Sequence, residues 1–135
     1  MMDVGLLVMR LVLGVIFIGH GAQKLFGSFG GPHISGFAKM LGQLGIKPAL
    51  PMAILAGLSE SIGGILVILG LLTPLAALAL IVVMIVAVLT VHLKKGFFNT
   101  NGGYEFNLAL AGMALTLLIA GAGAYSLDSV LGFFR

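Results

Sequence analysis

The residues of this sequence that can take part in chemistry are few, and the densest group of them is the segment 92–105. It contains a His, two Lys, two Asn, a Tyr and a Glu, and it lies between two long apolar stretches. His and carboxylate side chains act as general acids and bases, and Lys binds anionic or polarised oxygen atoms. Asn-Gly-Gly at 101–103 predicts a tight turn, because Gly tolerates positive φ and Asn bonds to nearby backbone.

The composition indicates the environment in which these residues are held. Of 135 residues, 60% are hydrophobic and only 8% are charged, whereas soluble domains carry roughly 25% charged residues. Lipid must therefore solvate most of the surface. The absence of Cys excludes a disulfide framework and thiol redox chemistry by this chain. The net charge of +3 contains no basic cluster, so we exclude a nucleic-acid partner.

Four apolar segments are long enough to be read as membrane-spanning helices, since about 20 helical residues cover ~30 Å. They lie at about 4–23, 49–72, 75–92 and 106–122. The first could be a signal peptide, but Arg10 interrupts it and no basic residues precede it, so we expect it to be retained.

Two shorter segments have apolar residues at helical spacing, and we expect them to lie in the membrane interface. Ser35 and Ser126 are their expected N-caps, and Thr73-Pro74 is expected to start the third span. The sequence thus predicts an all-α fold in a single domain, 1–135. It is an integral membrane four-helix antiparallel bundle with short interfacial amphipathic helices.

The lysines predict the orientation of this bundle. An even number of spans places both termini on one side and the loops after spans one and three on the other. Five lysines belong to the loop side: Lys24, Lys39, Lys47, Lys94 and Lys95. Because cytoplasmic loops are enriched in Lys and Arg, we expect these loops in the cytoplasm and both termini outside, in a multi-pass protein of the cytoplasmic membrane.

Two opposite charges stand inside apolar spans. Counted from the loop ends of their helices, Arg10 lies at ~20 Å and Glu60 at ~17 Å. A lone charge at the bilayer centre costs at least ~2.5–3.5 kcal/mol, so we predict that Arg10 and Glu60 form an ion pair. The sequence leaves open whether this pair only fixes helix register or also faces a ligand.

A second layer of polar residues is expected near the loop-side membrane face. His20 and Lys24 end the first span, and they are expected to face His92 and the residues that open the fourth span: Asn99, Asn101, Tyr104 and Glu105. We call this group the polar mouth. Glu105 suits a helix N-terminus and could accept a ring proton from a His. Each residue also fits a solvated boundary position, and only their convergence favours a site.

The two His of the mouth lie on different helices and lack metal-ligand spacing, so we expect neither a metal site nor a haem.

Several motifs resemble the DoxX family of small bacterial and archaeal membrane proteins, over nearly the full length. The matching pieces are Arg10-Leu-Val-Leu-Gly14, His20-Gly-Ala-Gln-Lys24-Leu-Phe-Gly27, Gly36-Phe37, Ala56-Gly-Leu-Ser-Glu60, Gly63-Gly64, Gly70-Leu-Leu-Thr-Pro74, His92 to Phe98, Asn101-Gly-Gly-Tyr-Glu105 and Tyr125-Ser-Leu-Asp128. The resemblance implies a four-helix membrane protein. It also implies an association with membrane redox complexes, including a thiosulfate:quinone oxidoreductase subunit and assemblies that handle sulfur and oxidative stress.

These observations together give a functional expectation. We expect a membrane protein of a redox-associated, quinone- or sulfur-linked system that binds a small lipid-soluble or anionic ligand, with a quinone as one candidate cofactor. The expected ligand-binding residues are Arg10, His20, Lys24, Glu60, His92, Asn99, Asn101, Tyr104 and Glu105.

One alternative is a non-catalytic accessory or scaffold subunit of an oxidoreductase complex that docks a soluble redox partner through the third loop. A small-solute carrier ranks behind both, because no inverted repeat is visible. The sequence leaves open whether the chain is itself an oxidoreductase, and whether it forms a homo-oligomer.

Overall fold

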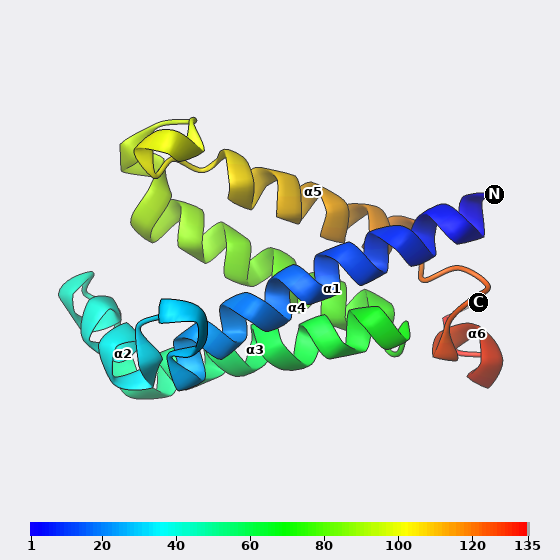
Figure 1. The fold of residues 1–135 in the computed structure, drawn as a ribbon, viewed down its shortest axis with the longest axis horizontal. Helices are drawn as coiled ribbons and strands as arrows, with labels where there is room; N and C mark the ends of the chain where they lie inside the picture. The colour runs from blue at the N-terminus through cyan, green and yellow to red at the C-terminus, as the bar shows by residue number, and fades with distance from the viewer. Residues whose placement is uncertain (135) are drawn as a thin grey trace.

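The fold is a set of long apolar helices lying roughly along one axis (Figure 1). The computed structural model describes residues 1–134, and this part of the chain contains no strand. The helices are α1 (Met2–Phe26), α2 (His33–Gln43), α3 (Ala49–Leu69), α4 (Thr73–Ala87), α5 (Glu105–Ala120) and α6 (Leu127–Leu131). Short 3-10 turns lie at Ser28–Gly30, Leu93–Lys95 and Asn99–Asn101, and a π turn at Val88–His92 extends α4.

The apolar helices confirm an all-α membrane bundle. Met2–Phe26, Ala49–Leu69 and Thr73–Lys95 are each long and apolar enough to cross a bilayer. Helix α5 is apolar but has only 16 residues, so its crossing stays a prediction.

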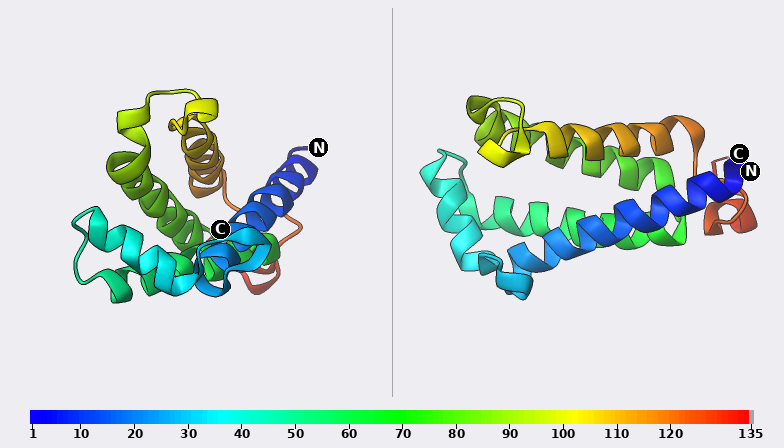
Figure 2. Two further views of the ribbon diagram at one scale, coloured as in Figure 1. Left: turned by 60° about the vertical axis from the view of Figure 1, so that its left-hand side comes forward. Right: turned by 45° about the horizontal axis from the view of Figure 1, so that its top comes forward.

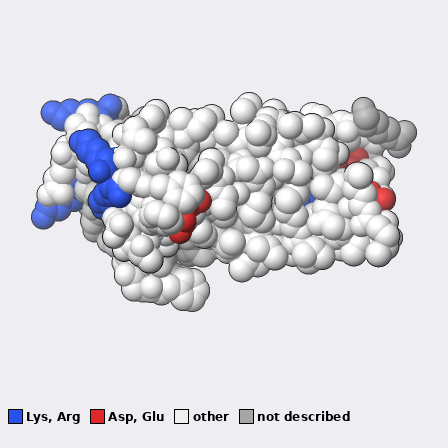
Figure 3. Space-filling model, turned by 90° about the horizontal axis from the view of Figure 1, so that it is seen from above, with Lys and Arg blue, Asp and Glu red and all other residues white. Residues whose placement is uncertain are grey.

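Charge is distributed very unevenly along the molecule. On the face drawn in Figure 3, most Lys and Arg side chains gather at one end, and most of the middle is uncharged. This is the arrangement on which the predicted orientation rests. That this end faces the cytoplasm stays a prediction.

Helices α1 and α3 pack closely along a seam of glycines. A Cβ added at Gly14 would lie 2.7 Å from the carbonyl oxygen of Gly64, and one added at Gly21 would lie 2.8 Å from the backbone nitrogen of Ser61. Only Gly allows the two backbones to approach this closely. The expected close packing at Gly14 and Gly21 is confirmed, and the seam fixes which turns of the two antiparallel helices face each other.

Helices α4 and α5 form a second antiparallel pair, and the main core lies between the pairs. Phe17 of α1, Leu80 of α4 and Leu117 of α5 are almost completely buried there. In all views α1 and α5 approach each other at the N-terminal end of α1 and diverge toward its C-terminal end (Figures 1 and 2). This divergence separates the two helix pairs at the end that carries the loops.

Helix α2 differs in part from the expected interfacial helix. Phe37 and Leu41 are buried against Ala53 of α3, so α2 packs on protein with one face rather than resting only on lipid. Ser35 does not cap it. The helix begins at His33, and the backbone nitrogen of Ser35 donates to Nδ1 of that His at 3.4 Å.

The reversal from α3 to α4 is also capped differently from the expectation. Gly70 ends α3 in the left-handed region (φ 63), as expected. Thr73 is not the N-cap of α4, because the first turn is capped from a distance by Asp128. The two carboxylate oxygens of Asp128 accept from the backbone nitrogens of Leu72 at 2.7 Å and Thr73 at 2.9 Å. Ser126 does cap α6 as expected, accepting from the nitrogen of Ser129 at 3.2 Å, but that helix has only five residues.

Candidate functional site

Arg10 lies in a cage of backbone carbonyls at the end of the molecule that carries both termini. Its guanidinium donates to the carbonyl oxygens of Val67 (2.9 Å) and Ile68 (2.7 Å), in the last turn of α3. It also donates to those of Ala122 (3.0 Å) and Tyr125 (2.8 Å), between α5 and α6. A cation here complements the negative end of the α3 dipole. We call this arrangement the Arg10 clasp.

Gly70 makes room for the clasp. A Cβ at this position would lie 2.7 Å from Nη2 of Arg10. The positive φ that ends α3 and the space for the guanidinium are thus supplied by one residue. The Arg10 clasp thereby joins the end of α3 to the segment before α6.

The predicted ion pair between Arg10 and Glu60 is wrong. The count of residues assumed that the loop-side ends of α1 and α3 are level. The glycine seam instead places Gly14 opposite Gly64, so Arg10 lies beside the last turn of α3, and Glu60 lies about two turns away along that helix. Two charges at equal counted depth are therefore not neighbours.

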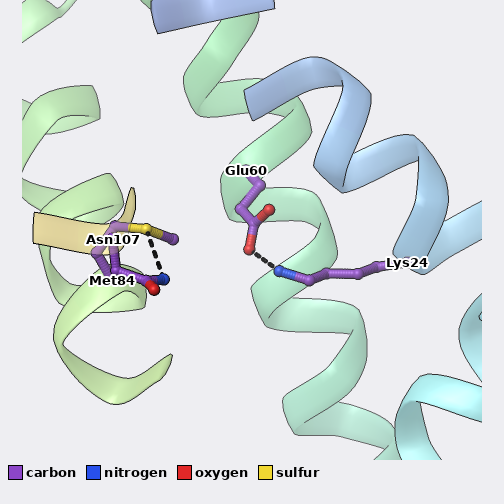
Figure 4. Close-up of polar contacts among 4 residues, drawn as sticks. All are labelled: Lys24, Glu60, Met84 and Asn107. Atoms are coloured by element: carbon purple, nitrogen blue, oxygen red, sulfur yellow. Dashed lines mark hydrogen bonds and ion pairs between the residues drawn. The ribbon is translucent and has the colours of Figure 1, made fainter. Parts of the chain in front are cut away.

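Glu60 pairs with Lys24 instead. Its Oε1 forms an ion pair with Nζ of Lys24, which is 22% exposed, whereas the Glu60 side chain is fully buried. Its Oε2 is buried with no hydrogen-bond partner among residues 1–134. Figure 4 shows Lys24 reaching from α1 to the carboxylate, with Met84 and Asn107 on the other helix pair. Glu60 is thus held on one side only.

His20 is a half-buried residue of α1, one turn before Lys24. Its ring lies 5.8 Å from the ring of Phe106 on α5, between centroids. It is also within electrostatic range of both Glu60 and Lys24. His20, Lys24 and Glu60 are therefore the three predicted site residues that the fold brings together.

An open groove of about 330 Å³ runs along α1 beside His20. We call it the lateral groove. Its lining residues are Val15, Ile16, Gly19, His20, Gln23, Phe29 and Phe106. Helical spacing from His20 would have found the α1 members, since they share a stripe. No local signal in the sequence would have placed Phe29 and Phe106 against that stripe.

The loop residues of the predicted polar mouth form a separate structure. His92 Nδ1 lies 2.7 Å from the carbonyl oxygen of Gly102, so this ring atom is engaged within its own loop and not with Glu105. The ring of Tyr104 packs edge-on against Phe97 at 5.5 Å. Asn99 and Asn101 are exposed in a 3-10 turn. In every view this loop lies on the α4–α5 side, away from the end of α1 (Figures 1 and 2).

The polar mouth is therefore not one cluster. Arg10 lies at the opposite end of the molecule, and His92 and Tyr104 contact residues of their own loop, whereas the contact with His20 comes from Phe106 on α5. Among the described residues, no group of three His, Asp or Glu side chains is placed to hold a metal ion.

The comparisons with known proteins agree with these features. The family model of DoxX matches residues 5–93. "Putative oxidoreductase CatD" of Bacillus subtilis is 31% identical over 126 residues, covering 93% of this chain and 86% of that protein. "Inner membrane protein YqjF" of Escherichia coli is 31% identical over 129 residues, covering 96% and 93%. No solved structure matches.

A third relative, "Uncharacterized membrane protein Rv3486" of Mycobacterium tuberculosis, is 31% identical over 134 residues, covering 88% of this chain and 76% of that protein. The relatives thus extend the likeness beyond the region of the family model, which ends just after His92. With its apolar helices and its inner-membrane relatives, this chain belongs to the DoxX family and is a protein of the cytoplasmic membrane.

Proposed function

We propose that this chain is the ligand-binding membrane component of a redox-associated, quinone- or sulfur-linked system, and that its ligand binds at His20, Lys24 and Glu60. The observation that carries the proposal is the state of Glu60. It is completely buried, yet its Oε2 has no partner within the described part of the chain. A buried acceptor left without a donor costs about 1–3 kcal/mol, and a bound hydroxyl or N–H group would remove that cost.

The charge balance of the site favours a neutral ligand over an anion. Lys24 and Glu60 already neutralise each other, and an anion would have to displace Glu60 from its only ion-pair partner among residues 1–134. A neutral ligand can donate a hydroxyl group to Oε2 of Glu60, and one of its carbonyl or hydroxyl oxygens can accept from His20, without breaking the pair. A buried polar atom without a hydrogen-bond partner is uncommon in native proteins and is consistent with a binding role.

A quinone fits these residues. The apolar lining beside His20 suits a ring, and His20 can hydrogen-bond a ring oxygen. When bound, a quinone supplies coupled electron and proton transfer. The chain would orient the ring at His20 and hold or release a proton at Oε2 of Glu60. The printed name of the Bacillus subtilis relative, an oxidoreductase name, supports a redox association without naming a ligand.

The test is Glu60→Gln in the full chain, reconstituted in lipid nanodiscs. Binding of the reduced quinol form of a decyl-substituted benzoquinone and of thiosulfate is measured against the unaltered chain. We expect the quinol affinity to fall about tenfold or more, because the quinol hydroxyl loses its hydrogen bond to a charged acceptor. Thermal unfolding should change little, because Lys24 is part-exposed and can reach water.

The matched control is Glu105→Gln, which removes the carboxylate at the first residue of α5, outside the groove lining, and should leave both affinities unchanged. The proposal is overturned if the unaltered chain binds neither probe, or if Glu60→Gln binds both as tightly as the unaltered chain does.

A further inference from the structure

The lateral groove opens through the side of the bundle. It lies where α1 and α5 have diverged, and its walls are residues of α1 and the ring of Phe106 on α5. Val15, at its outer edge, is 63% exposed within a span that lies in lipid. Acyl chains are therefore the medium against this groove, and a solute from water would not meet it first.

Gly19 keeps the groove open. Apart from its own helix neighbours, no heavy atom of residues 1–134 lies within 4 Å of the position that its Cβ would take. Gly14 and Gly21, in contrast, would collide with α3 if they carried a side chain. Packing against α3 thus explains Gly14 and Gly21 but not Gly19, although a helical Gly costs about 1 kcal/mol relative to Ala. A large side chain at Gly19 would fill the space that the groove now offers.

His20 lines the groove, and on the same helix it lies one turn before Lys24, the ion-pair partner of Glu60. A molecule in the groove can therefore contact His20 while the rest of it remains among acyl chains. The groove thus connects the bilayer with the polar group of the site through one side chain.

A turn at the end of α1 presents the second aromatic wall. Phe29 has φ 54, in the left-handed region that non-glycine residues rarely occupy. Its carbonyl oxygen lies 3.4 Å from Nε2 of Gln23, which also lines the groove. Phe29 and Phe106 therefore place two rings beside a mostly aliphatic surface.

The volume limits what fits. About 330 Å³ lies at the lower end of the range for small-molecule sites, roughly 300–1,000 Å³. This suits a single planar ring with short substituents, and any long tail would extend into the bilayer. Aromatic walls favour a flat, polarisable ring over a bare acyl chain.

We propose that the ligand is a lipid-soluble planar carbonyl compound of the quinone class, which reaches the site sideways from the bilayer through the lateral groove. Its ring lies over Gly19 between Phe29 and Phe106, with one carbonyl on His20 and its tail in lipid. This inference rests on the proposed function and specifies both its ligand class and its route.

The experiment uses the absence of Trp from the sequence. Phe29→Trp introduces one fluorophore at the groove, and quinones quench indole fluorescence. Titration of nanodiscs with the decyl-substituted benzoquinone should give saturable quenching with Phe29→Trp. Phe98→Trp is the control, because Phe98 is exposed on the separate loop. It should show only the linear quenching of quinone dissolved in lipid.

Gly19→Leu in the Phe29→Trp background should abolish the saturable component. Gly5→Leu is the matched control, because Gly5 is another α1 glycine with open space at its Cβ position, but it does not line the groove. It should leave the saturable component intact. As a second measurement on the chain without Trp, a photoreactive azido derivative of the benzoquinone should label residues within 15–23.

The outcomes separate this inference from the proposed function. Saturable quenching that survives Gly19→Leu, or equal quenching at Phe29→Trp and Phe98→Trp with no labelling in 15–23, overturns the route. Binding of thiosulfate alone, still sensitive to Glu60→Gln, overturns the ligand class and retains the proposed function. Binding of neither probe overturns both.

Discussion

Arg10 and Glu60 are both buried charges within apolar helices, but they differ in how fully hydrogen bonds surround them. Arg10 is 1% exposed and donates to four backbone carbonyls from two segments of the chain. Glu60 is 0% exposed and has one ion-pair partner, with its Oε2 unsatisfied within residues 1–134. Burying a charge is costly unless hydrogen bonds surround it, and only Arg10 meets that condition.

The difference separates two roles that look alike in the sequence. The Arg10 clasp uses the guanidinium to hold the end of α3 against the segment before α6, so a structural role accounts for it. The pair of Glu60 with Lys24 leaves an acceptor available and lies beside His20 and the lateral groove, which is why we assign ligand binding there and not to Arg10.

Arg10→Met should produce the largest effect. It removes the only side-chain donors of four carbonyls among the described contacts, and of these four only the carbonyl of Val67 also accepts from a backbone nitrogen outside a helix, that of Gly70. We expect a loss of about 4 kcal/mol or more in the free energy of unfolding, since each buried unsatisfied group costs roughly 1–3 kcal/mol. Thermal unfolding of the purified chain in detergent measures it. Arg10→Lys has fewer donors, so its free energy of unfolding should lie between those of the unaltered chain and Arg10→Met. An Arg10→Met chain as stable as the unaltered chain would show that the clasp is dispensable.

Asp128→Ala should give an intermediate effect at the same end of the molecule. Asp128 caps the first turn of α4 with both oxygens and lies within electrostatic range of Arg10. Loss of a helix cap costs about 0.5–2 kcal/mol. The same unfolding assay should show this loss, with a smaller one for Asp128→Asn, which keeps an acceptor. Strictly additive losses in the double variant with Arg10→Met would indicate that the two residues act independently.

His92→Ala should give the smallest effect, and it tests whether the loop that carries His92 takes part in ligand binding. The ring closes its own loop through Gly102, a part-exposed bond worth about 0.5–1.5 kcal/mol. We expect faster amide hydrogen exchange in the 99–103 turn and unchanged benzoquinone affinity. Thr90→Ala, which removes a hydroxyl bonded only to its own helix at Val86, is the control. A tenfold loss of benzoquinone affinity in His92→Ala would show that the loop is part of the ligand-binding site.

Much of the fold could be predicted because its signals are local. Long apolar segments give the spans, Gly70 gives the end of α3, and Ser126 gives the start of α6. The glycines at 14 and 21 predict a close helix contact, and α3 supplies it. These features depend on residues within one or two helical turns of each other.

The partners of the charged residues could not be predicted in the same way. Counting residues from helix ends placed Arg10 beside Glu60, whereas the seam shifts α1 along α3 by about two turns. Thr73 looked like a cap, but the cap comes from Asp128, 55 residues later. The prediction that the polar-mouth residues form one cluster was wrong for the same reason. Residues near one membrane face need not lie on the same side of the bundle.

The sequence alone therefore determined that lipid surrounds most of this protein, where its helices lie, and which polar residues need partners. It could do so because hydropathy, helical period and turn chemistry are local properties. Only the tertiary structure decided which partners they have. Helix register depends on how glycine surfaces meet, and the divergence of α1 from α5 depends on the packing of the whole core. Those two features give Arg10 its carbonyls, give Glu60 a single cation within the described chain, and leave the lateral groove open beside His20.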